Sequence, residues 1–270
     1  MILGIDAGIS ATKIIGLSQQ GVRIGCLRAE ASDQTTSIYG ALGKFMGTHN
    51  LRIGDIERIA ITGVGAFYVG SDMYGIPARQ VDEFLSIGTG GLAVAELESA
   101  VIISAGMGTA LVHAGNNKIT HLGGSGLGGG TLLKMAMRLT GATDFPTLIA
   151  LANLGDIRAV NLQISDISSG SIGKLSPATT VSNFGKLQPN ATSADMALGL
   201  INMIFESIGT MAALAAQGCG ARDIVLTGAL SEIKQGAEVF HALETLYPVR
   251  FHIPPQAMFA TAWGAALATD

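Results

Sequence analysis

The sequence predicts an α/β protein built from two related lobes. Strand-like and helix-like segments alternate along the chain, which is typical of this class. A strand, a glycine-containing turn and a second strand occur at residues 2–17, and the same order returns at residues 101–113. A strand that ends in Thr-Gly also occurs twice, at Thr62-Gly63 and at Thr227-Gly228. Because the order of elements repeats, we expect two lobes with the same plan.

The elements of the first lobe, residues 1–98, follow from local patterns. Gly8-Ile9-Ser10 and Gln19-Gln20-Gly21 separate three apolar runs, which predicts three antiparallel strands. Ser32 or Asp33 is a suitable cap for a helix that runs to about Gly47 with one apolar face. The expected strands span residues 2–7, 12–17, 22–27, 58–61 and 80–84, and an apolar helix leads from Ser86 to Glu98.

The second lobe, residues 99–270, restarts the pattern and extends it. Residues 161–188 are polar and irregular, which predicts a surface excursion or a mobile flap. The last helix is rich in alanine and glycine, so it can pack closely, and we expect it to pack back on the first lobe. The expected strands span residues 101–104, 109–113, 118–121, 223–227 and 249–253, and the expected helices span residues 128–140, 144–154, 193–217, 231–246 and 256–268.

Composition narrows the class of protein. The chain has 270 residues, of which 48% are hydrophobic and 13% are charged, so we expect large cores or an extensive subunit interface. Its net charge of −4 and its lack of a basic run argue against nucleic-acid binding. No run of about 18 apolar residues lacks both charge and glycine, and the N-terminus has no basic region, so we expect neither a membrane span nor a signal peptide. Cys26 and Cys219 form no metal or disulfide motif, which favours a cytoplasmic location.

A glycine run at residues 123–130 is the densest local signal, with six glycines in eight positions. Such a run packs poorly in a strand or helix, but it lets a backbone approach a ligand closely. An apolar helix follows it, so the run stands where a phosphate would meet a helix N-terminus. The alternative is a flexible linker, which is rarely set between a hairpin and an apolar helix.

Several motifs in order resemble those of the type II pantothenate kinases, within the actin, sugar-kinase and heat-shock-chaperone superfamily. Together they run from residue 4 to about residue 230. The matching segments are Gly4-Ile5-Asp6-Ala7-Gly8 with Lys13, Asp82-Glu83-Phe84, Gly106-Met107-Gly108-Thr109, the glycine run through Thr131, Leu139-Thr140-Gly141, Gly155-Asp156 and Ser182-Asn183-Phe184-Gly185.

The resemblance implies two ribonuclease-H-like lobes of the actin-like ATPase fold, with a nucleotide cleft between them. It also implies a cytoplasmic, homodimeric kinase that uses ATP and Mg²⁺ to phosphorylate the primary hydroxyl of pantothenate, the first step toward coenzyme A. The long helix at residues 193–217 is the candidate dimer interface. The nucleotide contacts implied by the resemblance are Asp6, Ala7, Gly8, Ser10, Lys13, Gly106, Met107, Gly108, Thr109, Gly128, Gly129, Gly130, Thr131, Phe145, Gly228 and Ala229.

The chemistry of single residues agrees with these roles while leaving alternatives open. A carboxylate at Asp6 can hold Mg²⁺, although aspartate also forms turns. Lys13 interrupts an apolar strand, which favours an anionic partner such as phosphate. The family's catalytic glutamate falls on Glu83, which would accept the hydroxyl proton and touch the acceptor. Its neighbour Asp82 is separated from that role only by the register with Phe84.

The sequence departs from the family pattern around the acceptor site. Ile9 replaces a glycine, Met107 replaces a hydroxyl residue, and Ala229 stands where some members have serine. His121 stands where the family has a substrate-binding arginine, so we expect its side chain to lie beside the acceptor and to hold an anionic substrate less firmly. The alternative is that Lys118 or Arg79 supplies the lost positive charge.

The departures keep other functions open. The acceptor could be pantetheine or an amino sugar instead of pantothenate. The chain could also be a nucleotide-binding module without catalysis, or an ATPase that activates a partner enzyme, as the dehydratase activators do. The spacing of Cys26 and Cys219 does not fit the iron–sulfur cluster that those activators carry.

Overall fold

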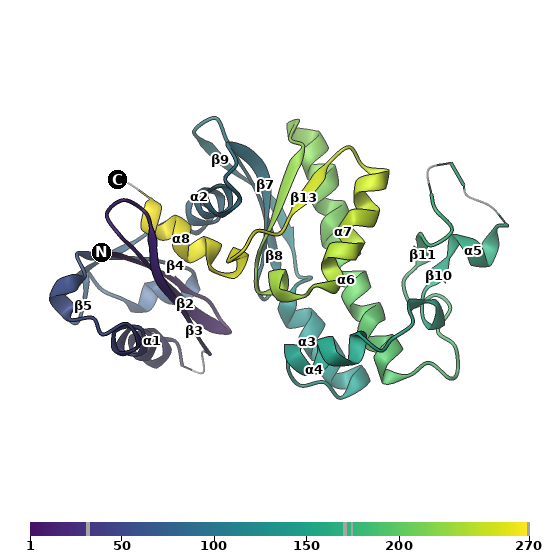
Figure 1. Cartoon of the computed structure of the whole chain (residues 1–270), viewed down its shortest axis with the longest axis horizontal. Helices are drawn as coiled ribbons and strands as arrows, with labels where there is room; N and C mark the ends of the chain where they lie inside the picture. Colours follow the sequence, from purple (N-terminus) through teal and green to yellow (C-terminus); the bar gives the residue numbers. More distant parts are fainter. Residues whose placement is uncertain (31–32, 170–171, 174, 269–270) are drawn as a thin grey trace.

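Two β-sheets form the centres of the two lobes (Figure 1), in a computed structural model that describes residues 1–30, 33–169, 172–173 and 175–268. The first sheet has six strands in the order β3-β2-β1-β4-β6-β5, and the second has five in the order β13-β12-β7-β8-β9. In each, the first strand of a three-stranded antiparallel meander also pairs with a parallel strand, and a second parallel strand follows. The first sheet also adds an antiparallel edge strand, β5. The two sheets therefore share one plan, which confirms the predicted fold class of two related lobes.

The first lobe follows the predicted order with small shifts in bounds. Asp33 caps α1 by accepting a hydrogen bond from the backbone N–H of Thr36, as expected, while Ser32 lies outside the described residues. The elements are β1 (Ile2–Ala7), β2 (Ala11–Leu17), β3 (Arg23–Glu30), α1 (Gln34–Thr48), β4 (Arg58–Thr62), β5 (Asp72–Met73), β6 (Ile76–Gln80) and α2 (Glu83–Ala95), with short 3₁₀ turns at Ile53–Asp55 and Val64–Tyr68.

The second lobe adds more helix around its sheet. Its elements are β7 (Ser99–Ala105), β8 (Thr109–Gly115), β9 (Lys118–Ser125), α3 (Gly129–Thr140), α4 (Phe145–Ala152), β10 (Leu162–Gln163), α5 (Ile164–Ile167), β11 (Thr180–Ser182), α6 (Ser193–Cys219), β12 (Asp223–Gly228), α7 (Gln235–Leu246), β13 (Arg250–His252) and α8 (Ala260–Leu267), with 3₁₀ turns at Ile157–Ala159, Ala229–Glu232 and Ala257–Phe259. The helices expected at 231–246 and 256–268 thus each begin with a separate 3₁₀ turn.

One expected element is wrong. Residues 80–84 do not form a strand, because β6 ends at Gln80 and α2 begins at Glu83. The side chain of Asp82 accepts a hydrogen bond from the backbone N–H of Leu85 at 2.8 Å, so it caps the helix and ends the extended segment. Glu83 is therefore the first residue of a helix and not the last residue of a strand.

Helices cover both faces of each sheet. In the first lobe, Leu3, Ile5 and Ile14 pack against α1, while Ile15 and Leu17 pack against α8 on the opposite face. In the second lobe, α2 covers one face of the sheet and α6 covers the other. The helices α2 and α8 thus lie between the two sheets (Figure 1).

The backbones of α2 and α8 touch, and two glycines make this possible. A Cβ on Gly90 would overlap the carbonyl oxygen of Ala260, and a Cβ on Gly264 would overlap that of Ser86. Glycine at both positions therefore allows the two helix backbones to lie in direct contact. Because α8 also packs on Ile15 and Leu17, this contact ties the end of the chain to the first sheet.

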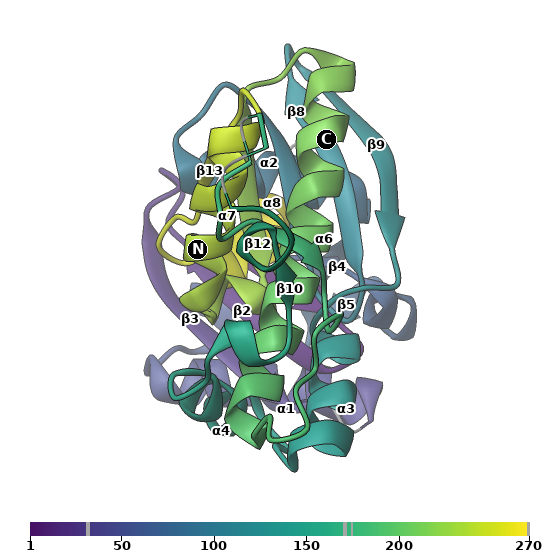
Figure 2. The ribbon, with the colours of Figure 1, turned by 90° about the vertical axis from the view of Figure 1, so that its right-hand side faces the viewer.

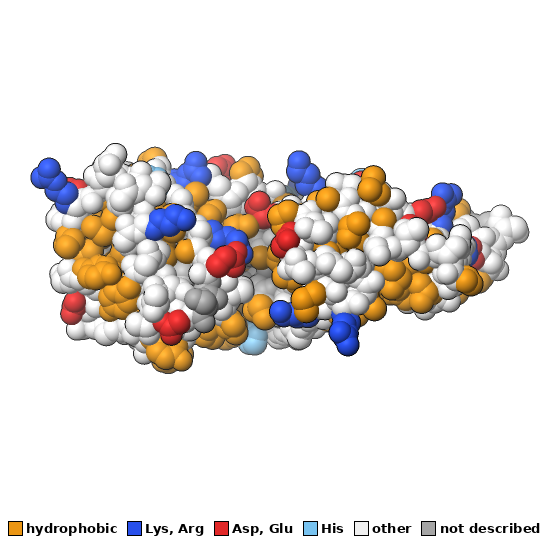
Figure 3. Space-filling view, turned by 90° about the horizontal axis from the view of Figure 1, so that it is seen from below, with side chains coloured by type: hydrophobic (Ala, Val, Ile, Leu, Met, Phe, Trp, Pro, Cys, Tyr) orange, Lys and Arg blue, Asp and Glu red, His pale blue; other side chains and the backbone are white. Residues whose placement is uncertain are grey.

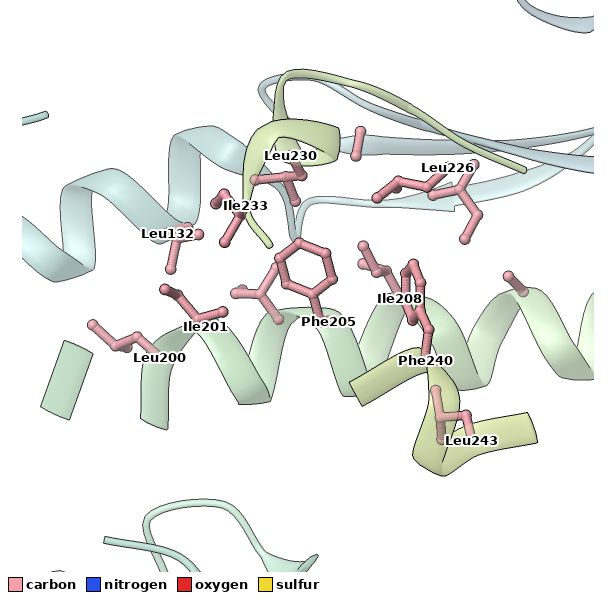
Figure 4. Packing of buried hydrophobic residues seen from close by; sticks show 14 of the residues in the cluster. Leu132, Leu200, Ile201, Phe205, Ile208, Leu226, Leu230, Ile233, Phe240 and Leu243 are labelled. Carbon is pink, nitrogen blue, oxygen red and sulfur yellow. The ribbon is translucent and has the colours of Figure 1, made fainter. Parts of the chain in front are cut away.

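The core of the second lobe is built around α6 (Figure 4). Its side chains Leu200, Ile201, Phe205 and Ile208 point toward Leu132, Leu226 and Leu230, and the ring of Phe240 lies beside Ile208. Thr192 and Asp195 form a capping box at its start. By length and composition α6 could cross a membrane, but 56% of its most apolar window is buried inside the protein.

The segment between α4 and α6 projects from the second lobe. Figure 2 shows β10 and the turns around it in front of α6 and α7. Side-chain amides attach this segment to α6. Asn161 and Asn202 donate hydrogen bonds to the side-chain oxygen of Asn183 at 3.0 and 3.1 Å, and Asn183 donates one to Glu206 at 2.6 Å. Burial raises the pKa of Glu206, an effect that the Asn183 hydrogen bond partly offsets. The excursion expected at residues 161–188 is thus anchored to α6 by a polar network.

Charge on the surface is dispersed. Figure 3 shows acidic and basic side chains mixed over the face seen from below, among many neutral side chains. This agrees with a chain whose net charge is only −4.

Candidate active site

The two glycine turns face each other across a cavity of about 230 Å³, here called the inner cavity. Gly8 and Ser10 of the β1–β2 turn come from the first lobe, and Gly106 and Gly108 of the β7–β8 turn come from the second. The duplicated strand–turn–strand units therefore meet at one site. The remaining lining residues are Asp6, Ile9, Ala11, Lys13, Gly63, Val64, Glu83, Ile87, Ser104, Met107, Ala110, Gly228 and Thr261.

Both Thr-Gly corners end at this site in the same conformation. Gly63 and Gly228 have φ angles of 83° and 86°, a region that favours glycine. A Cβ on either residue would press on a carbonyl oxygen, that of Ala7 or that of Ala105. The corners therefore hold β4 and β12 close to the two glycine turns, which explains why both lobes have glycine at this corner.

Asp6 and Lys13 form a partly buried ion pair on the wall of the inner cavity. The Nζ of Lys13 lies 3.0 Å from Oδ2 of Asp6, and their side chains are 11% and 12% exposed. The two residues stand opposite each other on β1 and β2, so they share one face of the sheet. Thr62 stands opposite Asp6 on the other side, and its buried hydroxyl has no hydrogen-bond partner.

This donor set fits a magnesium ion. Asp6 uses one carboxylate oxygen for Lys13, and its other oxygen is turned toward Gly63. Mg²⁺ in phosphoryl-transfer sites is commonly held by one or two carboxylates together with the substrate phosphates and water. Among the described residues, no three His, Cys, Asp or Glu side chains gather into a metal cage, so such an ion would depend on the phosphates.

Glu83 reaches the inner cavity from the first turn of α2. Burial raises the pKa of its carboxyl, the negative charges of Asp6 and Asp82 raise it further, and Lys13 partly offsets them. A carboxylate with a raised pKa is a better proton acceptor, as a general base requires. Asp82 instead lines a different cavity and caps the helix, so the structure separates the two neighbours that the sequence left nearly equivalent.

A larger cavity of about 850 Å³, here called the outer cavity, adjoins the inner cavity. Both cavities are lined by Ile9, Ser10, Gly106 and Met107, so they meet at the glycine turns. Its far wall is apolar and comes from several segments of the second lobe: Leu133, Phe145, Pro146, Ile149, Ala229, Ile233 and Met258. This arrangement suits a nucleotide, with the flat face of its nucleobase against the apolar wall of the outer cavity and its phosphates in the inner cavity.

The glycine run at the start of α3 supports the second turn by close packing. The backbone N–H groups of Gly129 and Gly130 donate to the carbonyls of Gly106 and Met107 at 2.8 and 3.0 Å. A Cβ on Gly128 would lie 2.6 Å from the carbonyl oxygen of Met107. In this conformation the glycines provide room, while these two N–H groups are already used within the protein. Thr131 likewise donates its hydroxyl to the carbonyl of Gly126.

The remaining predicted residues lie near this site. Ala7 is buried at the end of β1, and Thr109 is buried at the start of β8 with its hydroxyl unpartnered. His121 stacks on Phe84, with ring centroids 4.0 Å apart and planes at 14°. Together with Asp82, these two rings line a third cavity of about 970 Å³ between α2 and the β8–β9 hairpin, here called the hairpin cavity.

Lys118 and Arg79, the two candidates to replace the positive charge of the family arginine, lie in different places. Lys118 lines the hairpin cavity, as do Glu98, Asn116 and Asn117. Arg79 instead donates a hydrogen bond to the carbonyl of Ala268 at 2.8 Å. Of the two, Lys118 thus shares a cavity with His121.

Sequence reasoning missed some lining residues. Ser104 and Thr261 line the inner cavity, and Arg28 lines the outer cavity. Arg28 stands opposite Lys13 on the neighbouring strand, a relation that becomes visible only when the hairpin register is counted. The two cysteines lie apart, since Cys26 is on β3 and Cys219 ends α6.

Comparison with protein families and curated relatives gives consistent matches. The model of the Fumble family matches residues 99–247, more than half of the chain. A type II pantothenate kinase of Bacillus cereus is 25% identical over 235 residues, covering 84% of this chain and 82% of the relative. One from Staphylococcus haemolyticus is 26% identical over 237 residues and covers 84% of each. Pantothenate kinase 1 of rice is 33% identical over 138 residues, covering 48% of this chain and 21% of the relative.

Solved structures with low sequence identity share the fold. The activator of 2-hydroxyisocaproyl-CoA dehydratase from Clostridium difficile, with bound ADPNP, has a TM-score of 0.71 and 19% identity, covering 98% of this chain and 92% of that one. A ROK family glucokinase from Streptomyces griseus, in complex with glucose and AMPPNP, has a TM-score of 0.59 and 12% identity, covering 98% and 97%. These likenesses confirm the two-lobed actin-like ATPase architecture.

Proposed function

The chain belongs to the Fumble family, and we propose that it is a kinase that transfers the γ-phosphoryl group of ATP to the primary hydroxyl of pantothenate. The observation that carries the proposal is the inner cavity, where Asp6, Lys13 and Glu83 meet between the two glycine turns. The relatives that cover most of the chain are named type II pantothenate kinases, which supports pantothenate as acceptor. The reaction would be the first step toward coenzyme A.

The residues of the inner cavity have complementary roles in this reaction. Lys13 neutralises charge on the terminal phosphate, and the two turns leave room for the phosphate chain between the lobes. Asp6 would hold Mg²⁺, which neutralises charge on the phosphates when bound. Glu83 takes the proton of the acceptor hydroxyl as its oxygen bonds to the γ-phosphorus and the bond to ADP breaks.

The nucleoside fits the outer cavity. Phe145 and Ile233 supply an apolar wall for the base, and Ala229 and Gly228 lie where β12 ends beside it. A crystal soaked with a non-hydrolysable ATP analogue should show its phosphates between Gly8 and Gly106. Phosphates bound elsewhere would contradict this assignment.

The acceptor fits the hairpin cavity. Glu83 lines the inner cavity while its neighbours Asp82 and Phe84 line the hairpin cavity, so an acceptor beside Phe84 lies next to the candidate base. His121 is held against Phe84 by stacking, and Lys118 lines the same cavity. Lys118 supplies a positive charge for the carboxylate of pantothenate. His121, which replaces the family arginine, holds a carboxylate less well than arginine would.

An ADP-release assay with pantothenate, pantetheine and N-acetylglucosamine side by side tests the acceptor. Release that depends on pantothenate supports the proposal. Release only with pantetheine or the amino sugar would assign a related small-molecule kinase. Equal release without any acceptor would favour an ATPase.

We also propose that the protein is a cytoplasmic homodimer that binds neither nucleic acid nor membrane. Leu214 is 55% exposed on the outer side of α6, where an apolar residue suits a subunit contact. Light scattering after size-exclusion chromatography should give twice the chain mass, and Leu214→Glu should shift the population toward monomer. A monomeric wild type would refute the dimer.

A further inference from the structure

Arg28 continues a row of charged residues across the first sheet. Asp6 pairs with Lys13 between β1 and β2, and Lys13 pairs with Arg28 between β2 and β3. Residues directly opposite each other on neighbouring strands have side chains on the same face. Arg28 therefore stands on the face that carries Asp6 and Lys13, one strand further from Glu83.

The position of Arg28 takes it into the outer cavity. This residue of the first lobe lines the cavity together with Ser10, Met107 and Gly129. Lys13 lines the inner cavity and not the outer one. Since the two cavities meet at the glycine turns, a nucleotide whose terminal phosphate lies at Lys13 would have its inner phosphates near Arg28.

The charges of the site leave room for a further cation. Lys13 is already paired with Asp6, and Glu83 adds a second carboxyl to the same cavity. Among the described residues that line the two cavities, the other cations are Arg28 and Lys134. A nucleotide adds several negative charges at this point, and Arg28 or Lys134 can balance the part of that charge that Lys13 and a bound Mg²⁺ leave.

Arg28 is available because its present partner is weakly held. Its Nη1 lies 2.6 Å from Oε1 of Glu30, whose side chain is 74% exposed. Exposed ion pairs contribute little free energy, so a phosphate can replace this carboxylate at small cost. Glu30 thus uses donors of Arg28 that a phosphate could take over.

We propose that Arg28 is a further phosphate-binding residue that the first lobe contributes to the nucleotide site between the two lobes. The guanidinium leaves Glu30 and donates to the α- or β-phosphate, which its planar fork matches better than a lysine would. This inference rests on the proposed kinase function and adds to it a residue that sets the affinity for the diphosphate part of the nucleotide. Glu30 competes with the phosphate for the same donors.

Binding of ADP and of adenosine, measured by isothermal titration calorimetry, tests the proposal. Arg28→Gln should weaken ADP binding roughly 10- to 100-fold, the usual size of a lost hydrogen bond to a charged group, and leave adenosine binding unchanged. Glu30→Gln should tighten ADP binding, because the competing carboxylate is gone. The double variant should bind ADP as weakly as Arg28→Gln alone.

Two control variants make the test specific. Arg23→Gln removes an exposed arginine from the start of the same strand and should leave ADP binding unchanged. Lys134→Gln removes the other cation of the outer cavity; a loss there with none at Arg28 would overturn the proposal. Equal losses for ADP and adenosine in Arg28→Gln would assign it a structural role and also overturn it. If wild type bound ADP but Arg28→Gln bound it equally well, only this inference would fail, whereas a wild type that binds no ADP would refute the proposed function as well.

Discussion

Replacing Glu83 with glutamine separates the candidate base from its neighbour Asp82. Glutamine keeps the size and burial of the side chain but cannot accept the hydroxyl proton. We expect turnover to fall by roughly 10²- to 10⁴-fold, the contribution of a positioned general base. This corresponds to about 3–5 kcal/mol in activation free energy. Nucleotide affinity should barely change, because the glycine turns, Lys13 and the outer cavity are left intact.

Asp82→Asn is the matched control, and the structure predicts a different signature for it. Asparagine still caps α2, so stability and turnover should change little. The charge of Asp82 is one of the causes that raise the pKa of Glu83. Turnover requires ionised Glu83, so it is present above this pKa and lost as the pH falls through it. Removing the charge of Asp82 lowers the pKa and should move the acidic limb of the kcat profile to lower pH.

Steady-state kinetics with pantothenate from pH 5 to 8 checks both variants. A large loss of turnover in Asp82→Asn together with a mild effect in Glu83→Gln would refute the assignment of the base. An acidic limb that stays in place in Asp82→Asn would refute the electrostatic coupling between the two carboxyls.

Other predictions concern packing, the polar network and the acceptor. Gly264→Ala should lower the free energy of unfolding by several kcal/mol in denaturant titrations, because its Cβ would overlap the backbone of α2. Gly43→Ala is the control on α1, where a Cβ meets open space, and it should raise the free energy of unfolding by about 0.5–1 kcal/mol. An equal effect of both variants would contradict the close packing of α2 and α8. Burial raises the pKa of Glu206, so this carboxyl binds a proton more readily in the folded protein than in the unfolded chain. The folded protein therefore loses stability as the pH rises through the raised pKa of Glu206. Glu206→Gln should therefore remove part of the stability difference between pH 5 and pH 8, and an unchanged difference would show that Glu206 does not cause it. His121→Arg should lower KM for pantothenate more than KM for pantetheine, because arginine grips a carboxylate with two donors; no change in either KM would place the acceptor elsewhere.

The sequence predicted those parts of the site that depend on local pattern. The glycine turns at Gly8 and Gly106 and the Thr-Gly corners at Gly63 and Gly228 require special backbone geometry, which leaves a visible trace in residue type. Because these features recur in both lobes, they also predicted the duplicated fold. The resemblance to a kinase family then indicated Phe145, which lines the outer cavity.

Features that depend on distant contacts or on register were not predictable in the same way. The start of α2 is a local exception: residues 80–84 have the pattern of a strand, and the hydrogen bond from the Leu85 N–H to Asp82 shows that the helix begins at Glu83. Arg28 was overlooked because its relation to Lys13 follows from hairpin pairing. The hydrogen bonds from Gly129 and Gly130 to the second turn join segments some twenty residues apart. In the sequence, a glycine run whose N–H groups are used within the protein looks the same as one whose N–H groups are free to bind an anion.

The identity of the phosphorylated product tests the central claim most directly. The account predicts that incubation with ATP, Mg²⁺ and pantothenate yields ADP and an equal amount of a phosphate monoester on the primary hydroxyl of pantothenate, which ³¹P NMR and mass spectrometry identify. Glu83→Gln should form the same product far more slowly. Formation of ADP and inorganic phosphate without the monoester would contradict the account and assign the cleft to an ATPase.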